Sequence, residues 1–228
     1  MRAPASETNG ECDDMDESND HSASIVLYWI PLGAGARMVR FSGKAFEMIS
    51  AWVNRRPTCH LYHSALVVSV PEGRFVIEMT PVADDRGARR GVVAEGSVGT
   101  RWAGRLRLFR YEIRRWQGGL IADAIEATSV TCLSHDYVAA RHLLDLAPNV
   151  PTPVWGRDEL GAGEMWNSNS VTAWLLARSG VDVSHLAPPN GGRAPGWTAG
   201  VDVAARHSSI PMTGPLMADQ HARLIDTG

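Results

Sequence analysis

Two apolar segments joined by a short turn constrain the fold of this chain more than any other feature. Residues 61–70 read LYHSALVVSV and residues 74–81 read RFVIEMTP, with Pro71, Glu72 and Gly73 between them. Runs of this length, rich in β-branched residues and separated by turn-forming residues, are typical of a β-hairpin. Both faces of the first run are apolar, which indicates a strand in the interior of a sheet.

Other segments predict the elements around this hairpin. Residues 24–31, SIVLYWIP, and residues 104–113, GRLRLFRYEI, are typical of further strands. Residues 42–56 carry apolar side chains at three- and four-residue steps and predict a helix, and residues 134–147 predict another. The Gly- and Arg-rich residues 84–104 predict a long loop. Clustered strands with helices to one side favour an α+β fold over an alternating α/β fold.

Composition divides the chain into one domain and two tails. Residues 1–22 are strongly acidic and nearly devoid of apolar side chains, so they predict a disordered acidic N-terminal tail. Residues 23–206 contain all the predicted elements and form a single α+β domain. Residues 207–228 have little periodicity and predict a flexible C-terminal tail.

Net charge and cysteine content limit which binding partners and which cellular compartment we expect. The net charge of -3 gives no electrostatic reason to expect nucleic acid or an anionic membrane, and no apolar run is long enough to span a bilayer. The 3 cysteines are odd in number and have no metal-like spacing, so we expect a reducing, cytoplasmic environment, no metal and no cofactor. Lys44 is the only lysine, and arginine-rich usage indicates a high-GC bacterial genome. The oligomeric state stays open.

A histidine and a glutamate lie in the predicted hairpin. His63 shares a strand face with Ala65 and Val67. Folding the chain about residues 71–72 brings His63 opposite residues 79–80, next to Glu78. A carboxylate that accepts from an imidazole orients the ring and stabilises its protonated form. A hydrogen-bonded core histidine and an arginine-paired glutamate are the alternatives.

A run of small polar residues opens an apolar helix late in the chain. Asn167, Ser168, Asn169 and Ser170 precede a segment whose apolar positions recur at helical spacing. The predicted buried stripe consists of Val171, Trp174 and Leu175. Ser168 or Ser170 would cap this helix. The free backbone N–H groups and the positive dipole of a helix N-terminus can also stabilise an attacking anion or form an oxyanion hole.

The blocks HSALVV, RFVIEM and WNSNSVTAWLL, in this order, resemble three blocks of circularly permuted papain-like proteins of the NlpC/P60 superfamily. The resemblance covers roughly residues 60–180. It implies an antiparallel sheet packed on a nucleophile helix, with His63 as the base, Glu78 as the orienting residue and Ser168 in the nucleophile position. The implied activity is that of a hydrolase or acyl transferase acting on an amide or ester bond of a small-molecule, peptide or lipid substrate.

Serine stands where the family normally has cysteine. A helix terminus and an imidazolium can lower the pKa of a cysteine enough to give a thiolate, but a serine alcohol must lose its proton to a base during attack. Ser168 would therefore depend on His63. The alternative is a catalytically inactive binding module of the same fold.

Several further residues are candidates for the site. Asn167 and Asn169 are expected to contact substrate, Arg193 to hold a carboxylate and Trp197 to wall a pocket, with a packed return loop as the alternative. Weaker candidates are Cys59 and Cys132 as nucleophiles, His60 as the base, and the LGAGAR segment at 32–37, which lacks the third glycine of a dinucleotide-binding motif.

Overall fold

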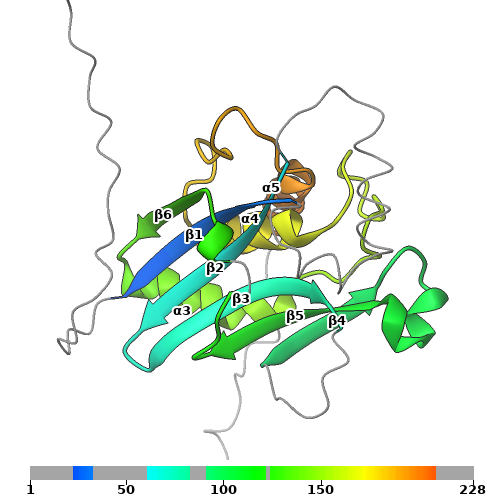
Figure 1. Ribbon diagram of the computed structural model, residues 1–228, viewed down its shortest axis with the longest axis horizontal. Coiled ribbons are helices and arrows are strands. Elements are labelled where there is room, and N and C mark those ends of the chain that lie inside the picture. The colour runs from blue at the N-terminus through cyan, green and yellow to red at the C-terminus, as the bar shows by residue number, and fades with distance from the viewer. Residues whose placement is uncertain (1–22, 33–60, 83–90, 122–123, 209–228) are drawn as a thin grey trace, which may run out of the picture.

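The computed structural model describes residues 23–32, 61–82, 91–121 and 124–208. This part of the chain forms an α+β fold with one six-stranded antiparallel sheet, in the order β4-β5-β3-β2-β1-β6 (Figure 1). The strands are β1 Ser24–Pro31, β2 Tyr62–Val70, β3 Gly73–Pro81, β4 Val92–Ser97, β5 Arg110–Gln117 and β6 Ser129–Ser134. The helices are α3 Tyr137–Leu146, α4 Ser168–Arg178 and α5 Trp197–Ser208. None of these helices has the length and apolar character needed to cross a membrane.

The predicted hairpin is confirmed as β2 and β3. The two strands pair from Leu66 opposite Ile77 to Val70 opposite Gly73, with the turn at residues 71–72. Gly73 has φ +132, a value that L side chains rarely adopt, so glycine suits the end of this turn. β2 lies between β1 and β3, which confirms the prediction of an interior strand.

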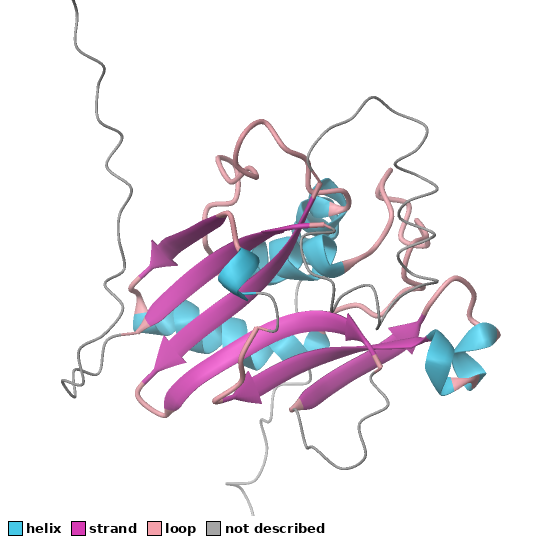
Figure 2. Cartoon of the chain, in the orientation of Figure 1, coloured by secondary structure: helices cyan, strands magenta, loops and turns pink. Residues whose placement is uncertain are grey.

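The two faces of the sheet differ in what covers them. We call the face that carries α3, α4 and α5 the helix face (Figure 2). Alternate residues of β2, including Tyr62, Leu66 and Val68, point into the core on the helix face together with Trp174 and Leu175 of α4. The intervening residues belong to a smaller cluster on the opposite face, which consists of Val26, Ile30, Ala65, Val67, Val76 and Ile121.

The ladder between β2 and β3 covers only part of each strand. It begins at Leu66 and Ile77, whereas residues 78–81 of β3 pair with β5 alone. The first residues of β2 pair with β1, and the Tyr62 N–H donates to the carbonyl of Arg193 at 2.9 Å. Because β3 does not pair with the start of β2, the loop that contains Arg193 lies beside that part of β2 instead.

The expected strand over residues 104–113 is only half correct. β5 begins at Arg110, and residues 103–105 and 107–109 form two 3-10 turns instead. Leu106 and Leu108 are exposed, as are the arginines beside them, so the alternation of leucine and arginine does not mark a buried strand face. The predicted loop over 84–104 is also wrong in part, because it contains β4.

Three other elements differ from expectation. β6 and α5 were not predicted. The cap of α3 is Asp136, whose carboxylate accepts from the Val138 N–H at 2.9 Å, rather than Ser134. The Asp136 carboxylate lies within reach of an N–H group in the first turn of the helix. The Ser134 hydroxyl instead accepts from the Asp136 N–H, which precedes the helix. The expected C-terminal tail at 207–228 begins too early, because α5 continues to Ser208. The expected tail at 1–22, the rest of the C-terminal tail and the helix at 42–56 lie outside the described residues.

Candidate functional site

The start of α4 is capped by Asn167. Its side-chain oxygen accepts from the N–H groups of Asn169 at 2.9 Å and Ser170 at 3.4 Å, and the Ser170 hydroxyl accepts from the Asn167 N–H at 3.1 Å. This reciprocal pair is a capping box. The predicted cap, Ser168 or Ser170, is therefore wrong, because the asparagine one residue earlier reaches both N–H groups. The N–H groups of Asn169 and Ser170, which an oxyanion hole would use, therefore already donate to the Asn167 side chain.

Asn169 links α4 to two other parts of the chain. Its side-chain N–H groups donate to the carbonyls of Tyr62 and Pro195, each at 3.0 Å, and its oxygen accepts from the Ser64 hydroxyl at 2.9 Å. Asn169 is 2 % exposed. Because both donors and the acceptor are engaged inside the protein, this amide holds β2, α4 and the Pro195 loop together. This structural role differs from the substrate contact that the sequence predicted for Asn169.

The loop before α5 is fastened to the same helix start. The Asn167 side chain donates to the Pro195 carbonyl at 2.8 Å, and the Ser170 hydroxyl donates to the Gly196 carbonyl at 2.7 Å. Gly196 has φ +83, and a Cβ there would lie 2.7 Å from the Met165 carbonyl oxygen. Only glycine fits this approach without strain. Asn167 thus serves the cap and the loop, and it is 6 % exposed.

Arg193 and Trp197 lie at the two ends of this loop. Arg193 is exposed, and its backbone carbonyl is the group that contacts β2. Trp197 begins α5 and packs on Trp29 of β1, with ring centroids 5.0 Å apart and the planes at 46°. Trp29 is buried on the helix face. The indole of Trp197 therefore contributes to the packing of the loop, which was the alternative interpretation of this segment.

The structure does not bring His63 and Ser168 together. Ser64 points to the helix face, because its hydroxyl bonds Asn169 of α4. Its neighbour His63 therefore points to the opposite face, where its cross-strand partner Ile30 also lies. Ser168 is the half-buried first residue of α4, on the helix face. The predicted pairing of base and nucleophile is wrong because neighbouring strand residues alternate between faces.

Glu78 shares the opposite face with His63 but contacts an arginine. Its carboxylate lies 3.3 Å from Nη1 of Arg114 on the neighbouring strand β5. Arg114 Nε also donates to Glu112 at 2.6 Å, and the arginine side chain is 4 % exposed. An arginine between two carboxylates neutralises much of their charge. Glu78 thus matches the arginine-paired alternative rather than an orienting partner for His63.

Burial governs the protonation of His63. It lowers the pKa of the imidazole to about 4, and Nε2 is buried without a hydrogen-bond partner among the described residues. A carboxylate accepting from the ring would act in the other direction and raise the pKa. His63 is therefore a neutral imidazole at pH 7, and burial rather than an ion pair controls it.

This pKa predicts a loss of stability in mild acid. Unfolded His63 gains its proton near pH 6.5, whereas the folded protein resists protonation down to about pH 4. The unfolded state thus binds more protons across this window, and the free energy of unfolding falls as the pH falls. Because His63 as a whole residue is only half-buried, solvent screens part of this effect, and we expect a loss of about 1–2 kcal/mol from it. Urea unfolding of wild type and His63→Leu between these pH values measures it; equal pH slopes would contradict the assignment.

Of the remaining sequence candidates, Cys132 lies within the described residues and does not join the site. Cys132 lies on the edge strand β6, with its sulfur 3.3 Å from Nε2 of His135 and 3.8 Å from the Ser134 carbonyl. Cys59, His60 and most of the LGAGAR segment lie outside the described residues. Within the described ranges, no group of His, Cys, Asp and Glu side chains is arranged to hold a metal ion.

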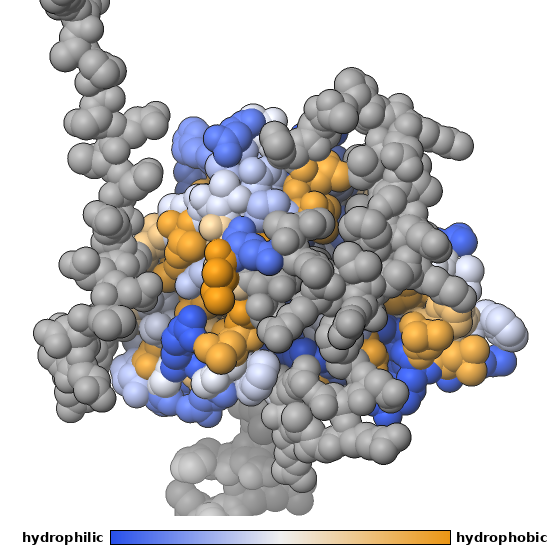
Figure 3. Space-filling model, viewed as in Figure 1, coloured by the Kyte–Doolittle hydropathy of each residue, from blue (hydrophilic) through white to orange (hydrophobic). Residues whose placement is uncertain are grey.

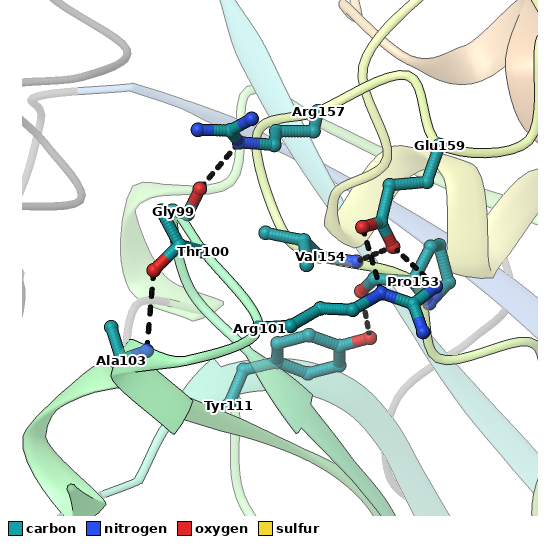
Figure 4. Close-up of polar contacts among 9 residues, drawn as sticks. All are labelled: Gly99, Thr100, Arg101, Ala103, Tyr111, Pro153, Val154, Arg157 and Glu159. Atoms are coloured by element: carbon teal, nitrogen blue, oxygen red, sulfur yellow. Dashed lines mark hydrogen bonds and ion pairs between the residues drawn. The ribbon is translucent and has the colours of Figure 1, made fainter. Parts of the chain in front are cut away.

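A second polar cluster, which the sequence did not predict, links β5 to residues 153–159 (Figure 4). The buried Tyr111 hydroxyl donates to the Pro153 carbonyl at 2.8 Å, and burial raises its pKa. Glu159 accepts from Arg101 at 3.0 and 3.1 Å and from the Val154 N–H at 2.9 Å. The hydrogen bond from Arg101 lowers the pKa of the Glu159 carboxyl. These contacts fix the loop between β4 and β5.

Comparison of the chain with protein-family models, with curated proteins and with solved structures gave no match.

Proposed function

We propose that this chain is a non-catalytic binding protein built on a papain-like arrangement of the permuted NlpC/P60 type. The order of the elements supports the arrangement: the strand with His63, its hairpin partner, and then a late helix that opens with Asn167 and packs on the antiparallel sheet. The chain would thus have the fold that the sequence blocks imply, without the hydrolase or acyl transferase activity.

The observation that carries the proposal is the hydrogen bond from Ser64 to Asn169, at 2.9 Å. A base that acts on Ser168 from the sheet would have to be a strand residue whose side chain faces the start of α4. Ser64 occupies this position, and a serine hydroxyl cannot accept and hold a proton near neutral pH as histidine does. The polar groups around it are engaged in cap and loop contacts, which supports a structural role for this region.

The catalytic alternative is an amide or ester hydrolase, or an acyl transferase, with Ser168, His63 and Glu78 as a triad. It requires the imidazole of His63 within about 2.6–3.2 Å of the Ser168 hydroxyl during reaction. Because His63 faces away from the helix that carries Ser168, and Glu78 is paired with Arg114, the non-catalytic proposal has the stronger support.

A fluorophosphonate probe tests the proposal. Such probes phosphonylate serines that a neighbouring base has activated. We expect wild type and Ser168→Ala to give the same background signal over pH 6–9, while a known serine hydrolase in parallel is labelled. Labelling of wild type that disappears in Ser168→Ala would overturn the proposal in favour of the hydrolase. Ser170→Ala is unsuitable as a control, because that hydroxyl holds the Gly196 loop.

A further inference from the structure

The loop between β4 and β5 exposes an apolar tip. Trp102 is 73 % exposed, Leu106 57 % and Leu108 76 %. Trp102 precedes the first 3-10 turn, Leu106 lies between the two turns and Leu108 lies in the second. The two turns lie at the edge of the sheet, away from the three helices (Figure 1). Figure 3 shows an apolar patch set among hydrophilic residues at this end of the molecule. Leaving three large apolar side chains in water is unfavourable, so they indicate a surface that becomes covered.

The same tip is strongly basic. Residues 96–111 contain four arginines and no aspartate or glutamate. Arg101 and Arg110 pair with Glu159 and Glu95. Arg105 and Arg107 are exposed and make no ion pair within the described part of the chain. The overall charge of -3 conceals this local excess, because seven acidic residues lie within positions 1–22.

The base of the tip is held rigidly (Figure 4). The Thr100 hydroxyl accepts from the Ala103 N–H at 3.2 Å, and Arg157 donates to the Gly99 carbonyl. A Cβ on Gly104 would lie 2.0 Å from the Ser97 hydroxyl oxygen, so this turn is pressed against the end of β4. A tip fixed in this way presents its apolar side chains without the entropic cost of ordering a loop on binding.

The chemistry of the tip fits an anionic membrane surface. Tryptophan and leucine enter the interface of a bilayer, while arginine pairs with lipid phosphates beside them. A protein partner would need about 800 Å² of complementary surface on each side, whereas three apolar side chains on a projecting turn offer much less. A bilayer requires only a few inserted side chains and nearby positive charge.

We propose that residues 101–110 dock this protein on an anionic lipid membrane, with Trp102, Leu106 and Leu108 in the interface and Arg105 and Arg107 on lipid phosphates. The docking surface lies apart from the start of α4 and does not depend on whether Ser168 reacts. It attaches the protein to one leaflet and involves no spanning segment.

Co-sedimentation of the full chain with vesicles tests this proposal. We expect binding to vesicles of phosphatidylcholine and phosphatidylglycerol at about 7:3, weak binding to phosphatidylcholine alone, and a decrease as salt rises. Arg105→Glu with Arg107→Glu should weaken binding by more than about tenfold. Trp102→Ser with Leu108→Ser should weaken it similarly, because it removes the two most exposed apolar side chains of the tip.

Matched variants separate the tip from general effects. Val138, on α3, is 71 % exposed, so Val138→Ser removes an apolar side chain of comparable exposure elsewhere. Arg141→Glu reverses an exposed arginine away from the tip. Both should bind vesicles as wild type does, and urea midpoints check that every variant folds. Failure of wild type to bind anionic vesicles, or equal loss in tip and control variants, overturns the proposal. Binding of single-stranded nucleic acid or a protein through the tip, without vesicle binding, also overturns it.

Discussion

Replacing Arg114 with methionine should lower the free energy of unfolding by about 3–5 kcal/mol. The arginine side chain is 4 % exposed and contacts both Glu112 and Glu78. Its removal takes away the positive charge that both carboxylates contact, and a buried charge that loses its counter-charge is costly. Urea or guanidinium unfolding at pH 7 measures the loss.

Two comparisons show whether charge is the cause. Arg141 is 43 % exposed and pairs with Glu72, so Arg141→Met should cost less than about 1 kcal/mol. Adding Glu112→Gln and Glu78→Gln to Arg114→Met should recover part of the lost stability, because the negative charges that Arg114 neutralised are then removed as well. If Arg114→Met costs no more than Arg141→Met, the buried cluster does not stabilise the sheet as described.

Asn169→Ala should destabilise the protein by about 2–4 kcal/mol. The substitution removes two donors and one acceptor that join β2, α4 and the Pro195 loop. The Tyr62 carbonyl and the Ser64 hydroxyl then lose a buried partner. Asn169→Asp should be at least as harmful, because a carboxylate cannot donate to the two carbonyls.

Asn149 provides the control for this prediction. It is exposed in a turn after α3, so Asn149→Ala should change the free energy of unfolding by no more than about 0.5 kcal/mol. The same chemical unfolding experiment serves both variants. Near-wild-type stability of Asn169→Ala would instead favour the expectation that this amide is reserved for a substrate.

Strong local patterns predicted the centre of the fold. β1, the β2–β3 hairpin and the buried stripe of α4 follow from runs of apolar residues with turn signals between them. β4 and β6 escaped prediction because they are short edge strands whose residues are half-buried or exposed, so they lack a buried apolar face. Leu106 and Leu108 alternate with arginine as strand residues do, but they lie in an exposed tip, so the predicted strand began too early.

The predicted site required knowing which face of β2 lies against α4, and periodicity does not determine this. Alternation placed His63 correctly on the face of Ala65 and Val67. Because both faces of β2 are apolar, the sequence does not say which of them α4 covers. One signal was available: Ser64 is a small polar residue in an apolar strand and needed a partner, and Asn169 is that partner.

The most direct test of the account uses a cysteine at position 168. Ser168→Cys is made in a chain whose Cys12, Cys59 and Cys132 are serine, and the rate of iodoacetamide alkylation is followed against pH, with and without His63→Ala. The two midpoints should agree within about 0.3 units, because His63 lies on the opposite face of the sheet and cannot stabilise the thiolate. A midpoint that rises by about one unit or more when His63 is removed would place the imidazole beside residue 168 and contradict the account.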